Sequence, residues 1–465
     1  PTGGQRLPAP LPPPELIVQD ELHLIAGPLG SMAGLYETAL EALCCREVDG
    51  VRVRPKIVAS TATVRRAEAQ IRALFDRSRT AVFPPPGPDR RDSFFARTVE
   101  TPEESRLYVG VAAPGRSPKV LFLRIATTLL AAAAEAWAEA GGKVPGNPAD
   151  PYMTLVAYFN ALRELGSARR IVEDEVRTRL TAYAARRRVD EPAARFADRK
   201  LGEPLELTSR VDTTQVAEAK ARLATGFDGD RPVDVALATN MISVGLDVVR
   251  LGLMLVSGQP KTAAEYIQAT SRVGRDPSRP GLVVTLLNLN KPRDRSHYEH
   301  FARWHAAFYR AVEAISVTPF APRALDRGLA AVTVALARLG DPDLTPVDAA
   351  REAEAKRAEL ERVIETIARR AGPERAAAVR ARVAGLLDDW AALAAMRKAD
   401  GTSFGYTSAP GITKPLLREM LDSELAQADE KERRFRAPRS LRDVEPAVLL
   451  TKKAPNGAEI PDDAR

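Results

Sequence analysis

Short apolar runs alternate with helical patterns from about residue 15 to about residue 290 of the chain. The runs are ELIVQ, RPKIVAS, RLYVGVAA, YMTLVAYFN, LELTS, VDVALAT, LGLMLVSG and GLVVTLLNL. Apolar runs of strand length that alternate with helices are typical of a parallel sheet covered by helices on both faces. The sequence therefore predicts an α/β fold of the doubly wound, parallel type.

The chain contains 465 residues, which is more than one hydrophobic core usually accommodates, so we expect two or three domains. The breaker FPPPGPD, from Phe83 to Asp89, separates the first two apolar runs from the rest. From about Ala321 the strand pattern gives way to a sequence rich in Ala, Glu, Arg and Leu. The predicted parts are an α/β segment at 1–85, a connector at 86–103, a second α/β domain at 104–318 and an all-helical region at 319–465.

Composition argues against several kinds of protein. The only cysteines, Cys44 and Cys45, are adjacent, so neither a disulfide framework nor a cysteine zinc site is expected. No uninterrupted apolar run reaches the roughly 18 residues that span a bilayer, and no signal peptide is visible. These features predict a cytoplasmic protein without a membrane partner. The net charge of +7 permits a polyanionic partner but does not by itself identify one.

Two adjacent carboxylates, Asp20 and Glu21, follow the first apolar run in the stretch ELIVQDELH. Open parallel sheets bind their ligands at the carboxyl ends of the strands. One carboxylate there can hold Mg²⁺, because this cation prefers oxygen ligands, and its neighbour can deprotonate an attacking water. The alternative is a pair of solvated acids at a strand end.

The stretch EYIQATSRVGRDP contains Gln268, Arg272 and Arg275 at helical spacings of four and three. A helix or a helix-to-loop segment can present these side chains together. Two guanidinium groups suit a phosphate, because arginine keeps its charge and donates hydrogen bonds from a planar fork. A solvated basic helix end is the alternative.

Three of the four histidines, His297, His300 and His305, lie in the aromatic stretch SHYEHFARWHAAFYR. The aromatic residues recur every three or four positions, which predicts a core stripe that docks a helix onto the second α/β domain. A zinc site and an exposed ring on which single-stranded bases stack are the alternatives.

Five short motifs occur along the chain, each in a strand-then-loop context. DELH at Asp20, TAT at Thr61, YFNALRELG at Tyr158, ATNMISVGLD at Ala238 and QATSRVGR at Gln268 resemble, in that order, motifs II, III, IV, V and VI of superfamily-two helicases. The longer stretches QDELHLIAGPLGSMAGLYETAL and MISVGLDVVRLGLMLVSGQPKTAAEYIQATSRVGR closely resemble the helicase component of DISARM anti-phage defence systems. The resemblance extends into the helical region, where it includes FRAPRSLRDVEP.

This resemblance implies two tandem RecA-like domains, with ATP bound between them and nucleic acid across their top. The first RecA-like domain would be incomplete and end near residue 85, and the second would span 104–318. Asp20 would hold Mg²⁺, and Glu21 would be the general base for attack of water on the γ-phosphate. The residues that would reach the γ-phosphate from the second domain are Gln268, Arg272 and Arg275, the two arginines as fingers.

The resemblance also implies residues that respond to the nucleotide. His23, Thr61 and Thr63 would couple the nucleotide state to the domain interface. Gly245 and Asp247 would touch the nucleotide itself. These assignments come from the positions of the residues within the matching motifs.

For nucleic acid, the resemblance implies that Asn160, Thr239 and Asn240 contact the backbone of the bound strand. Asn240 and Val244 stand where the commoner form of motif V has an acid and a base, so this motif departs from the family pattern. The implied partners are DNA and another protein of the defence system.

No phosphate-binding loop of the form G-x-x-x-x-G-K-[ST] precedes the Asp20 strand. Such a loop cradles the phosphates in nucleotide-hydrolysing RecA domains. We therefore expect an N-terminally truncated first domain, an ATP-dependent DNA helicase or translocase in the intact protein, and an inactive fragment in isolation. The alternatives are a non-hydrolysing nucleic-acid-binding scaffold and a helicase-like motor in DNA repair or chromatin remodelling.

Overall fold

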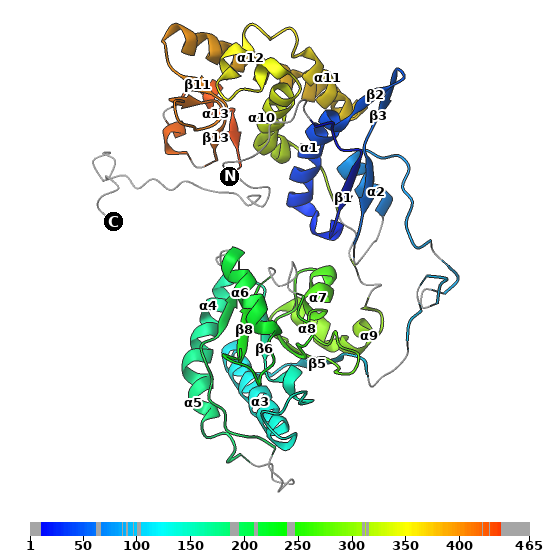
Figure 1. Cartoon of the computed structure of the whole chain (residues 1–465), viewed down its shortest axis with the longest axis vertical. Coiled ribbons are helices and arrows are strands. Elements are labelled where there is room, and N and C mark those ends of the chain that lie inside the picture. The colour runs from blue at the N-terminus through cyan, green and yellow to red at the C-terminus, as the bar shows by residue number, and fades with distance from the viewer. Residues whose placement is uncertain are drawn as a thin grey trace, which may run out of the picture. The chain divides into compact units, whose positions relative to one another are not determined.

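The chain forms two compact units in the computed structural model (Figure 1). Unit 1 combines Pro1–Pro85 with Ala314–Arg465, and unit 2 contains Pro86–Glu313. The structure describes residues 11–61, 67–85, 87–89, 92–95, 97–99, 104–186, 195–208, 213–239, 247–308, 312, 316–420, 422–426 and 428–438.

Unit 2 is built on a parallel sheet whose described strands follow the order β5-β10-β9-β6-β8-β7. The strands are β5 (Leu107–Val111), β6 (Leu155–Phe159), β7 (Leu205–Leu207), β8 (Val235–Ala238), β9 (Leu253–Ser257) and β10 (Leu282–Leu286). Every residue of β6 and β8 is buried, which explains why these runs are apolar along their whole length. The α/β prediction is confirmed by this sheet.

Helices cover both faces of the sheet. They are α3 (Pro118–Glu139), α4 (Leu162–Ile171), a π-helical turn (Val172–Val176), α5 (Arg177–Leu180), α6 (Thr213–Ala224), α7 (Ala263–Thr270), α8 (Pro292–Glu299) and α9 (Phe301–Ala306). Alternate residues of β6 belong to two different cores. Ala157 lies in the core beneath α3, α4 and α5, whereas Tyr158 lies in the core with α6 and α7.

Helix α3 is, among the described helices, the one that is long and apolar enough to cross a bilayer. The sequence shows no uninterrupted apolar run there, because Arg124 and Glu135 interrupt it. Leu130, Ala131 and Trp137 of this helix are buried inside unit 2. Its apolar character is therefore explained by packing against the sheet.

The aromatic stretch after β10 packs into the second of these cores. The ring of Trp304 lies 5.3 Å from that of Tyr266 on α7, and Phe308 lies 5.5 Å from Tyr108 on β5. Burial lowers the pKa of His305, whose Nε2 lies 3.2 Å from the Tyr266 hydroxyl. The interpretation of this stretch as a core stripe is confirmed for these residues.

Unit 1 joins a small α/β segment to the C-terminal helices. The segment contains β1 (Leu16–Gln19) and β4 (Lys56–Ala59) as a parallel pair, the hairpin of β2 (Arg46–Val48) and β3 (Val51–Val53), and the helices α1 (Gly27–Cys44) and α2 (Ala67–Phe75). The C-terminal part contains α10 (Pro322–Leu339), α11 (Glu361–Arg370), α12 (Pro373–Ala399) and α13 (Glu430–Arg433), with short 3₁₀ turns between them.

The C-terminal part is mainly helical, as predicted, but it also contains two pairs of very short parallel strands. These are β11 (Phe404–Gly405) with β12 (Lys414–Pro415), and β13 (Arg418–Glu419) with β14 (Arg436–Ala437). Strands of two residues carry no periodicity, so no sequence pattern indicates them.

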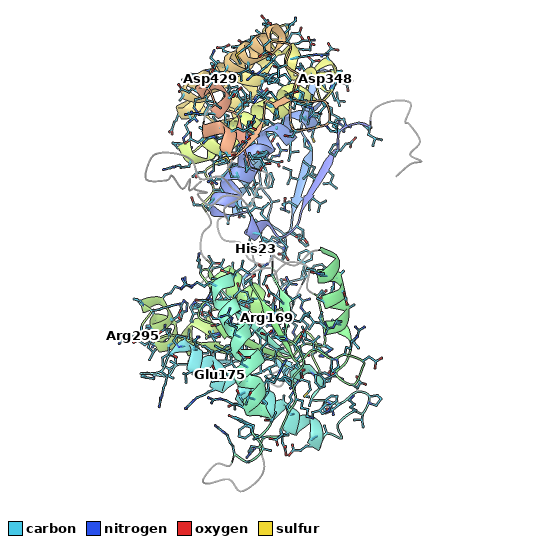
Figure 2. The ribbon with its side chains drawn as sticks, turned by 90° about the vertical axis from the view of Figure 1, so that its left-hand side faces the viewer. His23, Arg169, Glu175, Arg295, Asp348 and Asp429 are labelled. Carbon is cyan, nitrogen blue, oxygen red and sulfur yellow. The ribbon has the colours of Figure 1, made fainter. Side chains whose placement is uncertain are left out.

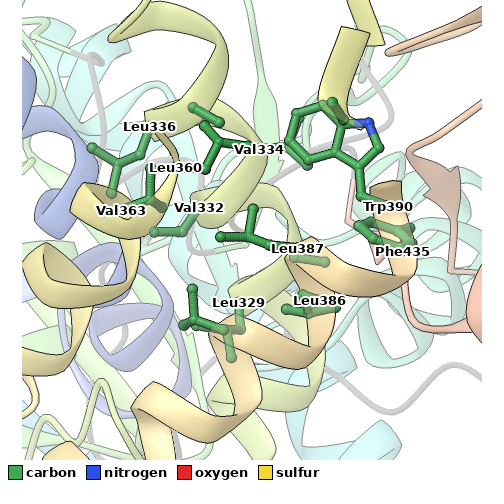
Figure 3. Packing of buried hydrophobic residues seen from close by; sticks show 14 of the residues in the cluster. Leu329, Val332, Val334, Leu336, Leu360, Val363, Leu386, Leu387, Trp390 and Phe435 are labelled. Atoms are coloured by element: carbon green, nitrogen blue, oxygen red, sulfur yellow. The ribbon is translucent and has the colours of Figure 1, made fainter. Parts of the chain in front are cut away.

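A single hydrophobic core spans both parts of unit 1. Leu35 and Ala39 of α1 belong to the same buried cluster as Leu329, Trp390 and Phe435, which Figure 3 shows from close by. Helix α1 therefore buries its apolar face against a helix that lies almost 300 residues further along the chain.

Polar contacts reinforce this packing. The Ser31 Oγ on α1 lies 3.3 Å from the Thr318 Oγ1 and accepts a hydrogen bond of 3.0 Å from the Thr318 N–H. Arg370 of α11 donates hydrogen bonds of 3.2 and 2.8 Å to the carbonyl oxygens of Ala73 and Leu74 at the end of α2. The segments that the sequence divides at residues 85 and 319 thus share one core.

We expect the substitution Leu35→Ala to lower the free energy of unfolding of unit 1 by about 2–5 kcal/mol, because it leaves a cavity in this core. Leu40→Ala on the same helix is the matched control, since Leu40 is 52% exposed and its loss should cost within about 0.5 kcal/mol. Chemical denaturation followed by tryptophan fluorescence measures both, because Trp390 lies in the core. Equal losses for the two variants would contradict the shared core.

Candidate functional site

The parallel pairing of β1 with β4 brings two predicted motifs side by side. Gln19 is paired with Ala59, so both strands end at the same edge. The Ser60 N–H donates to the Gln19 carbonyl oxygen at 2.9 Å, and the Leu22 N–H donates to the Ser60 carbonyl oxygen at 2.9 Å. Backbone hydrogen bonds therefore join the loop that carries Asp20 and Glu21 to the loop that carries Ser60 and Thr61.

Asp20 accepts two hydrogen bonds within this edge. The Ser60 hydroxyl donates to its Oδ1, and the Glu21 N–H donates to the same oxygen at 2.8 Å. These hydrogen bonds, that of Ser60 first, hold the pKa of the exposed Asp20 carboxyl below its ordinary value. Asp20 is thus an exposed carboxylate that stays ionised and can bind a cation.

Glu21 has a left-handed backbone conformation, with φ of 52° and ψ of 46°. Non-glycine residues seldom adopt this conformation, and those that do cluster at functional sites. The Glu21 Oε2 lies 3.5 Å from the Nδ1 of His23. The Glu21 carboxylate thus lies beside the ring of His23.

His23 links the two loops of this edge. Its Nδ1 lies 3.1 Å from the Thr61 Oγ1 as well as close to the Glu21 carboxylate, and the ring is buried. Figure 2 labels His23 within unit 1. Both neighbours can accept a hydrogen bond, which favours the tautomer with the proton on Nδ1. The structure therefore brings Glu21, the predicted base, together with His23 and Thr61, two of the predicted coupling residues.

In unit 2, the predicted phosphate-binding residues lie at the end of α7. Gln268 and Arg272 are buried, with 5% and 8% of their surface exposed. The helix ends at Thr270, so Arg272 and Arg275 lie in the turn that follows it. The alternative of a solvated basic helix end does not describe Arg272, because its guanidinium group is largely withdrawn from solvent.

Arg275 is oriented by two contacts. Its Nε donates to the Ser271 carbonyl oxygen at 3.0 Å, and its Nη1 forms an ion pair with the Asp247 carboxylate. The structure thus brings together Arg275 and Asp247, which lie 28 positions apart in the sequence. An incoming anion would compete with Asp247 for this guanidinium group.

Two residues that position α7 were not identified from the sequence. The Tyr158 hydroxyl on β6 donates to the Glu265 Oε1 at 2.6 Å, and burial raises the pKa of Tyr158. The Thr262 Oγ1 caps the helix by accepting from the Glu265 N–H at 3.1 Å. The cap was visible as a Thr-x-x-Glu pattern, whereas no local signal links Tyr158 to Glu265.

The predicted nucleic-acid contacts lie at the carboxyl ends of β6 and β8. The Asn160 Nδ2 donates to the carbonyl oxygens of Ser257 and Gly258 at 3.2 and 3.3 Å, so the amide holds the loop after β9. Thr239 is buried at the end of β8, where its N–H lies 3.4 Å from the Leu207 carbonyl oxygen. Three further predicted residues, Thr63, Asn240 and Gly245, lie outside the described residues.

Comparisons with known proteins agree with the motifs. Residues 182–277 match the helicase conserved C-terminal domain family. Over 336 residues the chain is 46% identical to the DISARM protein DrmA of Bacillus paralicheniformis, an alignment that covers 72% of this chain and 29% of DrmA. The chain thus spans less than a third of the length of that relative.

Among solved structures, the DUF1998 helicase MrfA bound to DNA is 18% identical with a TM-score of 0.43, over 69% of this chain and 35% of MrfA. The Mycobacterium smegmatis helicase Lhr bound to ssDNA and AMP-PNP is 19% identical with a TM-score of 0.45, over 81% of this chain and 38% of Lhr. The sequence matches thus show that the chain is similar to the DISARM protein DrmA over most of its own length, and that residues 182–277 match the helicase conserved C-terminal domain.

Proposed function

We propose that the complete protein is an ATP-dependent helicase or translocase of an anti-phage defence system, with DNA as its substrate. The observation that carries this proposal is the paired edge of β1 and β4, where Ser60 holds Asp20 and Thr61 meets His23. The arrangement supports the assignment of these two loops to motifs II and III. The sequence similarity to DrmA supports the defence role.

Asp20 is the residue of this chain that would hold Mg²⁺. Among the described residues, no group of three or more His, Cys, Asp or Glu side chains could hold a metal ion. The single exposed carboxylate of Asp20, held by Ser60 and the Glu21 N–H, suits Mg²⁺, which proteins commonly bind through one or two carboxylates together with substrate phosphates. When bound, the ion would neutralise charge on the phosphates of ATP.

Glu21 would accept the proton of the attacking water. A carboxylate in this role must be ionised and held in place, and the Nδ1 of His23 lies 3.5 Å from the Glu21 Oε2. Because the Nδ1 of His23 also lies 3.1 Å from the Thr61 Oγ1, a movement of the Glu21 side chain would shift His23 and, through it, the loop after β4. This link is our proposal for how nucleotide state is sensed in unit 1.

The γ-phosphate would be bound by Gln268, Arg272 and Arg275. Burial of Arg272 strengthens its interaction with an anion, because few water molecules compete for it. The ion pair between Arg275 and Asp247 keeps that guanidinium group oriented until phosphate replaces the carboxylate. Asn160, Thr239 and Asn240 remain the proposed contacts to the DNA backbone.

The experiment that tests this function compares the complete protein with the present chain. We expect the complete protein to hydrolyse ATP faster when single-stranded DNA is added, and the chain alone to bind DNA without hydrolysing ATP. The second expectation follows from the lack of a G-x-x-x-x-G-K-[ST] loop before the Asp20 strand. A phosphate-release assay with and without DNA measures turnover by both proteins, and the fluorescence anisotropy of a labelled oligonucleotide measures DNA binding by the chain alone.

The competing function is a non-hydrolysing scaffold that binds nucleic acid and another defence protein. It predicts that the complete protein does not turn over ATP and that nucleotide does not alter its affinity for DNA. Either of these results would overturn the motor proposal. ATP turnover by the isolated chain would overturn only the expectation of an inactive fragment.

A further inference from the structure

A groove lies at the carboxyl edge of the unit 2 sheet, between the first turns of α3 and α4. Its wider part has a volume of about 500 Å³, with Phe122, Phe159 and Leu286 among its lining residues. A second hollow of about 390 Å³ continues it along α4. Both hollows are lined by Lys119 and Arg163, so they form one continuous depression, which we call the α3–α4 groove.

Three cations follow this groove. Lys119 comes from the first turn of α3, and Arg163 and Arg170 come from α4. All three side chains are exposed, and none forms a hydrogen bond or an ion pair with another described residue. The groove therefore offers positive charge that the described part of the chain does not neutralise.

The spacing of the two arginines suits an extended ligand. Arg163 and Arg170 lie seven residues apart on one face of α4, which places them about 10 Å apart along the helix axis. Gly166 and Ser167 lie between them on that face and are small. A Cβ added at Gly166 would meet no atom within 4 Å, so the floor of this part is open.

Two acids that line the wider part of the groove have partners of their own. Glu164 pairs with Lys291 at 3.7 Å, and the buried Asp294 accepts hydrogen bonds of 3.3 and 3.1 Å from two backbone N–H groups. Asp174 and Glu175 lie at the far end of the second hollow (Figure 2 labels Glu175). They would repel an anion there and limit the length of the site.

Two helix N-termini add positive potential at the wider part. Helix α3 begins at Pro118 and contains 22 residues, and its first turn lines the groove. Helix α4 begins at Leu162 with no side-chain cap on its N–H groups. The uncapped N–H groups of α4 and the dipoles of both helices favour an anion at this position.

We propose that the α3–α4 groove binds the phosphate backbone of a single nucleic-acid strand, in addition to the contacts expected from Asn160, Thr239 and Asn240. The proposal rests on the proposed DNA-binding function and adds a site made of different residues. A continuous row of unpaired cations suits a polyanion better than a single phosphate group. The groove would hold the strand on the side of unit 2 that α3 and α4 cover.

The test measures binding of a labelled oligothymidylate to the present chain by fluorescence anisotropy at several salt concentrations. Each phosphate contact on single strands adds about 0.7 to the slope of log affinity against log salt. The triple variant Lys119→Ala, Arg163→Ala, Arg170→Ala should therefore lose about 2 from this slope. Between about 50 and 200 mM salt, the wild-type chain should lose roughly twentyfold more affinity than the variant.

The matched control is Lys143→Ala, Arg179→Ala, Lys200→Ala, which removes the same charge from three exposed cations outside the groove. This control should keep the wild-type slope. If the groove variant and the control behave alike while the wild-type chain binds DNA, the groove is not a strand site and the proposed function stands. If the wild-type chain does not bind the oligonucleotide at all, the proposed DNA-binding function fails and this inference fails with it.

Discussion

Replacing Glu21 by glutamine in the complete protein is expected to reduce ATP turnover by about 10²- to 10⁴-fold, the usual contribution of a general base. Glutamine has the same shape but cannot accept the proton of the attacking water. Asp20 keeps its hydrogen bonds from Ser60 and from the backbone, so ATP binding should persist. Steady-state phosphate release and binding of a fluorescent nucleotide measure the two effects separately.

Glu47→Gln is the matched control for this prediction. Glu47 lies exposed on β2 of the same unit, and the same chemical change there should leave turnover unaltered. Undiminished turnover in Glu21→Gln would remove Glu21 as the base. Loss of nucleotide binding together with turnover would instead show that Glu21 supports the structure of the site.

Replacing Arg275 by alanine should have a still larger effect, a loss of about 10³- to 10⁵-fold in ATP turnover. This corresponds to about 4–7 kcal/mol of activation free energy. Arg275→Lys should restore only part of the rate, because lysine keeps the charge but lacks the planar donor fork. Single-turnover measurements at saturating ATP report the chemical step directly.

Arg279→Ala provides the control, because Arg279 follows the same helix and its Nε lies 3.8 Å from the Asp276 carboxylate. Its removal takes away a guanidinium group a few residues from Arg275 and should leave the rate close to that of the wild type. A rate for Arg275→Ala within threefold or so of that control would contradict its role as a finger. The ion pair with Asp247 would then be a purely structural contact.

The positions of the strands in unit 2 can be predicted from the local pattern of apolar residues. The buried strand β6 has the continuous apolar sequence LVAYF, and both of its faces are covered. In unit 1, β1 alternates between exposed and half-buried residues, and it ends at Gln19, immediately before Asp20. Because a strand end locates the carboxyl edge of a parallel sheet, the acidic pair could be placed from the sequence.

Partners within the candidate site could not be predicted in the same way. Ser60 is one of several hydroxyl residues in ASTAT, and nothing local distinguishes it as the donor to Asp20. Tyr158 and Glu265 are 107 positions apart, and their hydrogen bond depends on how α7 packs against β6. Side-chain pairs of this kind require the register of neighbouring strands to be known.

The sequence by itself determined the alternation of strands and helices. It also determined the position of the acids at the end of β1 and the spacing of the arginines after α7. These features are local, because the spacing of apolar residues over a few positions indicates whether a segment is a helix or a strand. Only the tertiary structure decided that α1 shares a core with α10 and α12, and that Lys119 lies with Arg163 and Arg170 along one groove. These juxtapositions join residues that are distant in the chain. They depend on which apolar surfaces are buried against one another, and tertiary packing decides this.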